Sequence, residues 1–101
     1  LNSGITWHNQ VPEKFTLEQN YPNPFNPVTT IKFGLHKNAN VTLKVYDILG
    51  REVSILFNNV ALNAGAVVCS FDGTDLASGV YFYSLDVNDS KVDTKRMVIL
   101  K

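Results

Sequence analysis

Cysteine, histidine and long apolar runs are all scarce in this chain. Its 101 residues include one cysteine, Cys69, and two histidines, His8 and His36. A single cysteine cannot form an intrachain disulfide, and neither histidine has a second ligand at the spacing of a metal site. No apolar run approaches the ~18 residues that a membrane-spanning helix needs. We therefore expect no disulfide framework, no metal ion or other cofactor, and no membrane insertion.

An excess of charge of either sign is also missing. Nine Lys and Arg residues balance nine Asp and Glu residues. Nucleic acids and anionic membranes attract proteins with a basic surface, so this balance gives no reason to expect either partner. Hydrophobic residues make up 45% of the chain and charged residues 18%, which is typical of a folded domain. The length suits one domain rather than two.

The residue types of a catalytic site do not come together in this sequence. Catalysis by a nucleophile needs a base and a residue that orients the base, all converging on one cleft. Cys69 shares an apolar stripe with Val67 and Phe71, which predicts a buried side chain. The carboxylates of residues 72–75 and 86–89 lack the glutamate that ends an EF-hand loop, so we interpret them as turn caps rather than calcium ligands. The sequence predicts a protein that is not an enzyme.

The chain does contain a succession of short segments in which apolar and polar residues alternate. This period of two is typical of a half-buried strand. The predicted strands are residues 15–19, 29–35, 41–46, 51–57, 66–71, 80–87 and 92–100, with residues 58–64 as a loop. Residues 80–87 begin with apolar side chains on both faces, which indicates a central strand. The pattern predicts an all-β fold, a seven-stranded antiparallel immunoglobulin-like β-sandwich.

Three of the four prolines lie within residues 20–27, which we call the Pro/Asn segment. Its members are Asn20, Tyr21, Pro22, Asn23, Pro24, Phe25, Asn26 and Pro27. Proline fixes φ and lacks an N–H group, so this segment can be neither a helix nor a central strand. We expect the rings of Tyr21 and Phe25 to pin a stiff segment to the domain. The residues leave open whether the segment only anchors itself or also serves as a recognition surface.

Three cations, Lys95, Arg96 and Lys101, lie in or after the last predicted strand. They are candidates for contact with a receptor, and the edge of this strand is a candidate for pairing with a partner's sheet. A second interpretation is that these charges protect an edge strand from aggregation.

Several motifs, taken in order, resemble one family. Gln19-Asn20-Tyr21-Pro22-Asn23-Pro24-Phe25-Asn26-Pro27 resembles the opening of the type A C-terminal sorting domains of the type IX secretion system. The similarity continues in the family's order with Val45-Tyr46-Asp47-x-x-Gly50-Arg51 and then Leu76-x-Ser78-Gly79-Val80-Tyr81-Phe82-Tyr83-x-Leu85. It extends over residues 17–101 and includes the basic last strand.

The resemblance implies that residues 15–101 are a C-terminal sorting domain and that residues 1–14 are a linker or tail from an upstream cargo protein. Such a domain directs its covalently linked cargo through the periplasm to the cell surface or medium of Bacteroidetes-type bacteria. The implied partners are the type IX translocon and a sortase-type peptidase that cuts upstream of the fold. The domain itself is expected to be a non-catalytic monomer, recognised through the Pro/Asn segment and the three cations.

Two other functions remain open at this point. A carbohydrate-binding or adhesion β-sandwich would need exposed, coplanar aromatic rings, and the candidates Trp7, Tyr46 and Phe82 are scattered in the sequence. A structural immunoglobulin-like domain of the flagellar hook-capping kind is suggested by residues 72–75 and 79–83, and it would self-assemble.

Overall fold

The computed structural model describes residues 12–101, so most of the predicted tail, with Trp7 and His8, lies outside the described residues. The described chain forms strands only: β1 (Thr16–Leu17), β2 (Val28–Leu35), β3 (Ala39–Tyr46), β4 (Glu52–Leu62), β5 (Gly65–Asp72), β6 (Gly79–Val87) and β7 (Ser90–Ile99). Residues 12–101 contain no membrane-spanning helix. The all-β prediction is confirmed.

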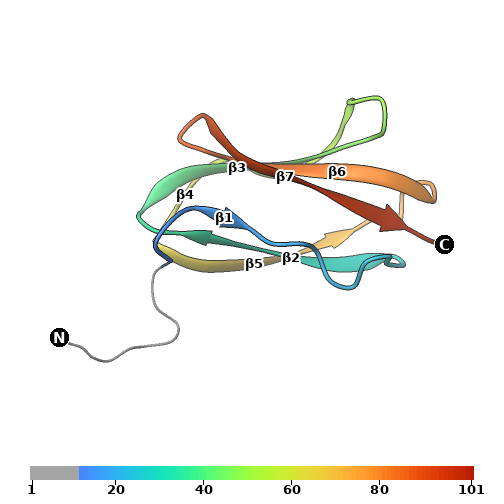
Figure 1. Ribbon diagram of the computed structural model, residues 1–101. Helices are drawn as coiled ribbons and strands as arrows, with labels where there is room; N and C mark the ends of the chain where they lie inside the picture. The colour runs from blue at the N-terminus through green and yellow to red at the C-terminus, as the bar shows by residue number, and fades with distance from the viewer. Residues whose placement is uncertain (1–11) are drawn as a thin grey trace.

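The strands form two antiparallel sheets that pack face to face (Figure 1). One sheet has three strands in the order β1-β2-β5, and the other has four in the order β4-β3-β6-β7. This arrangement confirms the immunoglobulin-like β-sandwich. It also places β6 between β3 and β7, so the prediction that residues 80–87 are a central strand is confirmed.

The core lies between the sheets, and every second residue of β2, β3 and β6 contributes to it. The fully buried side chains include those of Ile31, Phe33, Leu35, Val41, Leu43, Val45, Tyr83, Leu85, Met97 and Ile99. Burying one such side chain contributes about 1.5–3 kcal/mol to folding. The alternation read from the sequence is therefore the alternation between core and solvent.

The predicted end of the fourth strand is wrong, because β4 continues from Phe57 to Leu62 instead of giving way to a loop. The two asparagines of residues 58–59 fit into the strand because its pairing with β3 shifts register between Val41 and Leu43. Asn59 adopts a φ of 54°, and its N–H donates to the hydroxyl of Thr42 at 3.1 Å. A β-bulge thus accommodates residues that would ordinarily end a strand.

Cys69 is half-buried rather than buried. It faces the core from β5, and β5 is the outermost strand of its sheet, so one flank of the thiol stays open. Partial burial raises the pKa of the Cys69 thiol.

Candidate recognition surface

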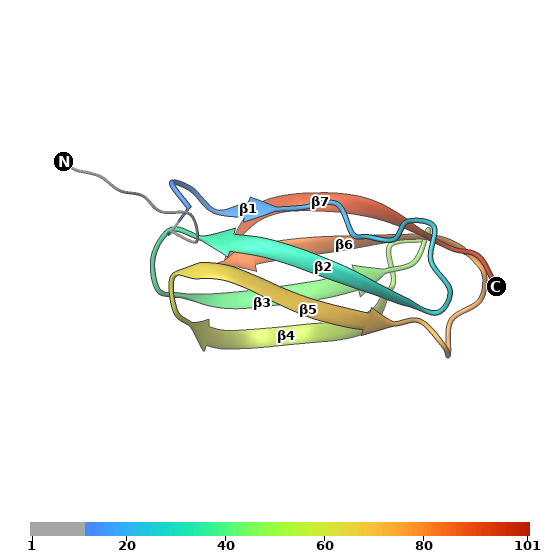
Figure 2. The ribbon, with the colours of Figure 1, turned by 90° about the horizontal axis from the view of Figure 1, so that it is seen from below.

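The Pro/Asn segment leaves β1 and runs beside the outer edge of β7 before it enters β2 (Figure 2). Main-chain hydrogen bonds join it to that edge. The N–H of Phe25 donates to the carbonyl of Val98 at 3.0 Å, and the N–H of Leu100 donates to the carbonyl of Phe25 at 3.0 Å. The side-chain oxygen of Asn23 accepts from the N–H of Val98 at 2.9 Å. The segment therefore covers the end of β7.

The residue before the segment extends this contact. The side-chain amide of Gln19 donates to the carbonyl of Arg96 at 2.6 Å and to the side-chain oxygen of Asn20 at 2.7 Å. Residues 96–100 thus have their outward main-chain groups occupied from within the chain. The expectation that the last strand offers a free edge to a partner is wrong for these residues.

Asn20 anchors the start of the segment from a buried position, with 2% of its surface exposed. Its amide donates to the hydroxyl of Thr29 at 3.0 Å and to the carbonyl of Pro22 at 3.2 Å. The Thr29 hydroxyl, also buried, donates to the same Pro22 carbonyl at 2.8 Å. Buried polar groups are stable when they bond to one another in this way, so the two side chains fix the fold of the segment.

Phe25 anchors the far end, as predicted, with 3% of its surface exposed. Its ring meets Phe71 edge-on, with 6.2 Å between ring centroids. The main chain at Gly73 packs closely against Phe25 and Ile99. A Cβ at this position would lie 2.9 Å from the side chain of Ile99 and 3.4 Å from that of Phe25. The N–H of Gly73 also donates to the carbonyl of Pro27 at 2.8 Å.

The prediction that the ring of Tyr21 also pins the segment to the domain is wrong. Its side chain is 80% exposed. The main chain of Tyr21 pairs with Thr30 through two hydrogen bonds of 3.0 and 2.9 Å, and this pairing leaves the ring in solvent. Beside the ring lies a pocket of about 330 Å³, lined by Glu18, Gln19, Tyr21, Thr30 and Lys32. The segment thus presents Tyr21 outward while Asn20 and Phe25 hold it in place.

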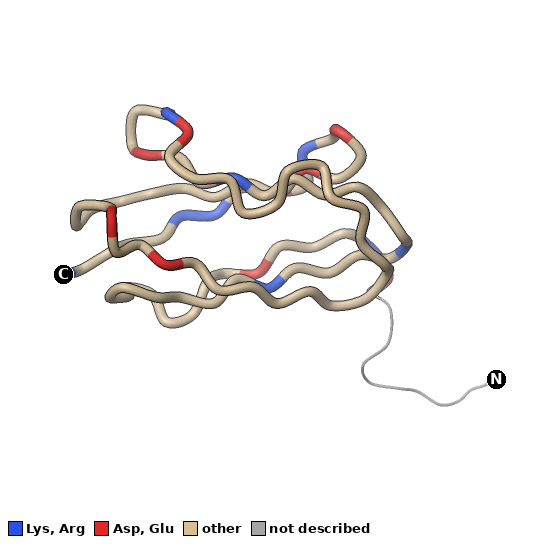
Figure 3. Tube along the Cα trace, turned by 180° about the vertical axis from the view of Figure 1, so that it is seen from behind, with Lys and Arg blue, Asp and Glu red and all other residues tan. Residues whose placement is uncertain are grey.

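The three predicted cations have separate surroundings, and Lys and Arg residues as a whole are spread over the described chain (Figure 3). Lys95 and Arg96 follow each other on β7 and so lie on opposite faces of the sheet. Lys95 is opposite Tyr83 and its ammonium lies 3.4 Å from the carboxylate of Asp93. Lys101 instead donates from its ammonium to the carbonyl of Thr74. Of the three, Arg96 is bonded through its main-chain carbonyl to Gln19, the residue before the Pro/Asn segment.

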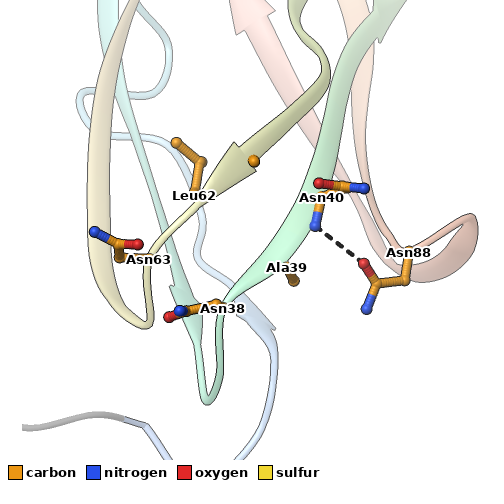
Figure 4. Close-up of a pocket in the computed structure, with 7 residues that line it drawn as sticks. Asn38, Ala39, Asn40, Leu62, Asn63 and Asn88 are labelled. Carbon is orange, nitrogen blue, oxygen red and sulfur yellow. Dashed lines mark hydrogen bonds between the residues drawn. The ribbon is translucent and has the colours of Figure 1, made fainter.

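An amide-lined pocket of about 380 Å³ lies between the turns at the other end of the sandwich (Figure 4). Its lining includes Asn38, Asn40, Asn63 and Asn88. The side-chain oxygen of Asn88 accepts from the N–H of Asn40 at 3.0 Å, which leaves its amide nitrogen as a donor. Sequence reasoning missed this pocket, because its residues come from three separate turns and the strand ends beside them.

The aromatic pair considered for sugar binding is brought together by the fold. Tyr46 on β3 lies opposite Phe82 on β6, on the outer face of the four-stranded sheet. They help to line a pocket of about 420 Å³ beside the 47–50 turn. The third candidate, Trp7, is outside the described residues.

The turn-cap interpretation fits Asp72, which accepts from the N–H of Thr74 at 2.9 Å. It is wrong for Asp86, which lies within β6 and whose Oδ1 is buried without a hydrogen-bond partner among the described residues. Asp47, in the turn between β3 and β4, accepts from the N–H groups of Leu49 and Arg51, both at 2.9 Å. Within residues 12–101, no three His, Cys, Asp or Glu side chains gather as metal ligands would.

Comparison with known proteins identifies the family. No curated protein sequence matches the chain. Among solved structures, the chain is similar to PorU of Porphyromonas gingivalis, known from a crystal structure of its dimeric latent form, with a TM-score of 0.71 and 22% identity. The likeness covers 99% of this chain and 10% of the PorU chain, so the present chain spans about a tenth of that protein, and it confirms the fold.

The family model described as the secretion system C-terminal sorting domain matches residues 19–100. The match includes the whole Pro/Asn segment and all strands from β2 to β7. The chain therefore belongs to the family of secretion system C-terminal sorting domains, the signals that send proteins through the type IX secretion system to the cell surface or beyond.

Proposed function

We propose that the folded Pro/Asn segment is the part of this sorting domain that the type IX translocon recognises. The supporting observation is the contrast between two neighbours: Asn20 is 2% exposed and Tyr21 is 80% exposed. A large aromatic side chain left in solvent on a firmly held backbone is the kind of residue that dominates protein interfaces. Pro22, Asn23 and Pro24 extend the exposed surface beside it.

A preordered segment makes recognition efficient. Immobilising a flexible loop on binding costs conformational entropy, which lowers affinity. Here the hydrogen bonds to β7 and the buried side chains of Asn20 and Phe25 have already fixed the loop. A receptor that contacts Tyr21 therefore gains the contact without ordering the segment.

The remaining parts of the proposal concern the cargo and its route. Residues 1–14 are a linker or tail from a covalently attached upstream cargo, and a sortase-type peptidase cuts in or before them. The domain passes through the periplasm as a folded monomer, one for each cargo chain, and performs no chemistry itself. Arg96, on the face of β7 away from the core, adds a positive contact, whereas Lys95 and Lys101 are occupied by local partners.

An export assay tests the role of Tyr21. The full chain is fused behind a signal peptide and a fluorescent reporter in a bacterium that has the type IX machinery. We expect Tyr21→Ser to reduce the reporter at the surface and in the medium about tenfold, the loss expected for removing a contact worth ~1.4 kcal/mol. The matched control is Leu49→Ser, because Leu49 is 73% exposed on the turn between β3 and β4, away from the segment.

Both variant domains are first compared with the parent by thermal unfolding, so that a folding defect is not mistaken for a recognition defect. Normal export of a folded Tyr21→Ser variant contradicts the proposal for the segment. Equal loss of export in both variants contradicts it too, because the effect would not be specific to Tyr21. Failure of the parent fusion to leave the periplasm would remove the export function from this chain altogether.

A further inference from the structure

The two lateral sides of the sandwich differ. On one side, β1 lies beside β7, and Gln19 and the Pro/Asn segment bond to β7 and the residue after it over residues 96–100. On the other side, β4 and β5 are the outermost strands of their sheets (Figure 2). Within residues 12–101, no element pairs with the outer edge of either strand. We call this side, bounded by the outer edges of β4 and β5, the open side.

Incomplete burial is concentrated at the open side. Eight apolar residues pack against the core while remaining partly exposed, and five of them belong to β4 or β5: Leu56, Phe57, Leu62, Val67 and Cys69. The sheet that contains β5 has three strands, and its partner sheet has four. A further strand beside β5 would equalise the two layers and cover these side chains.

The edge of β5 is regular enough to accept such a strand. Its pairing with β2 runs over eight residues without a register shift, whereas the pairing of β4 with β3 is interrupted at three points. Bulges of the β4 kind hinder further pairing, and straight edges permit it. The outer edge of β5 is therefore the better template.

The hydrogen bonds that β2 makes on its side away from β5 show which N–H and C=O groups of β5 are free. Thr30 exchanges hydrogen bonds with Tyr21, and the carbonyl of Lys32 accepts from Glu18, so these two residues of β2 face away from β5. The alternate residues of β2 must bond to β5, and their partners are Val67, Cys69 and Phe71. Consequently the N–H and C=O groups of Ala66, Val68 and Ser70 point toward the open side.

The open side lacks the charges that usually protect an edge. Residues 53–71 contain no Lys, Arg, Asp or Glu, and no proline. Edge strands are commonly guarded by charged side chains or proline. Val68, in the middle of the β5 edge, is instead a 60% exposed aliphatic residue. An uncharged edge favours an incoming strand without charges of its own.

The molecule already covers part of one sheet edge with an uncharged segment. Residues 19–25 bear no charge, bend between two isolated bridges, and bond to β7 through the main chain of Phe25 and the side chains of Gln19 and Asn23. We propose that the outer edge of β5 receives an extended, uncharged strand from a partner polypeptide, with apolar side chains at alternate positions. These side chains would lie over Val67, Cys69 and the inner face of β4. The contact is separate from the surface around Tyr21 and does not depend on its role.

Nuclear magnetic resonance with a defined peptide tests this inference. The probe is the uncharged, alternating peptide acetyl-Asn-Val-Gln-Val-Asn-Val-Gln-amide, added to the full chain labelled with nitrogen-15. We expect amide shifts along β5 and about tenfold slower hydrogen exchange at Ala66, Val68 and Ser70 when peptide is in excess, because these N–H groups become bonded. The same peptide with lysine in place of each valine should have no effect.

Variants of the edge make the test specific. Val68→Pro removes an outward N–H while leaving the ladder to β2 intact, so it should abolish the shifts. Val68→Thr keeps the N–H and the branched shape and should bind as the parent does. If Val68→Pro weakens the fold, Ala66→Pro provides a second block at the same edge.

Absence of shifts with the valine peptide, shifts located elsewhere, or shifts that survive both proline variants would overturn the inference. Protection of the same amides that grows with protein concentration in the absence of peptide would also overturn it, because a second copy would then occupy the edge. Export of the reporter fusion tests Tyr21 independently, so the two proposals can fail separately.

Discussion

The hydroxyl of Tyr83 donates a hydrogen bond to the carbonyl of Glu18 at 2.7 Å. This bond links the middle of the four-stranded sheet to the residue at which the chain leaves β1. Tyr83 is fully buried, and burial is the main reason that its pKa is raised to about 12. The entry to the Pro/Asn segment is therefore fastened to the core as well as to β7.

The raised pKa of Tyr83 predicts a loss of stability at alkaline pH. Its pKa in the unfolded chain is about 10, below the folded value. Stability that depends on the neutral hydroxyl is then fully present below about pH 10 and is lost as the pH rises through the folded pKa. Denaturant unfolding across this range should show the decline, and Tyr83→Phe should make it shallower. Ionisation of Tyr83 near pH 10 in the folded protein would contradict the prediction.

Removing the Phe25 ring should strongly destabilise the domain. Phe25→Ala leaves a cavity against Phe71 and Gly73, and such changes typically cost about 3–5 kcal/mol. Tyr21→Ala removes a ring that is 80% exposed and should change the unfolding free energy by less than about 0.5 kcal/mol. Urea denaturation of both variants measures the difference. Similar losses in the two variants would show that Tyr21 is also an anchor.

The buried pair Asn20 and Thr29 should behave as one unit. Asn20→Ala removes the amide that donates to the Thr29 hydroxyl and the Pro22 carbonyl, and also the acceptor of the Gln19 amide, at a cost of about 1–3 kcal/mol. The double variant with Thr29→Ala should cost less than the sum of the single changes, since the bond between the two side chains is lost in each single variant and would be counted twice. A double-mutant cycle by chemical denaturation measures this coupling. Simple additivity would indicate that the two side chains act separately.

Acid should weaken the turn between β3 and β4. Hydrogen bonding from the N–H of Arg51 is the largest cause of the lowered pKa of Asp47, and the Arg51 side chain and the N–H of Leu49 add to it. A lowered folded pKa means that the stabilisation is present above the unfolded value of about 3.9 and is lost as the pH falls through the folded pKa. Unfolding measured between neutral pH and about pH 2 should show a smaller acid-dependent decrease for Asp47→Asn than for the parent.

Much of the fold could be predicted because alternation is a local property. The buried residues of β2, β3 and β6 follow a period of two that needs no knowledge of the partner strand. The end of β4 could not be predicted in this way, because Asn59 stays in the strand through a bond to Thr42, seventeen positions earlier. Local propensity marks two asparagines as a turn, and the tertiary contact overrides it.

The site was predictable in location but not in detail. Three closely spaced prolines identify a stiff segment, yet hydrophobicity alone indicates that Tyr21 and Phe25 should both be buried. The structure separates them because Tyr21 pairs with Thr30 through its main chain, and a polar residue, Asn20, takes the buried position. The dispersal of Lys95, Arg96 and Lys101 also depends on contacts with distant residues. Such long-range pairings leave no trace in a single sequence.

The bond between Asn23 and Val98 joins residues that are 75 positions apart. During synthesis, the Pro/Asn segment leaves the ribosome long before the residues that hold it. A chain interrupted before residue 96 would contain the whole Pro/Asn segment but would lack the part of β7 that holds the segment in its folded conformation. The conformation of the segment thus depends on residues 96–100 and not on its own sequence alone.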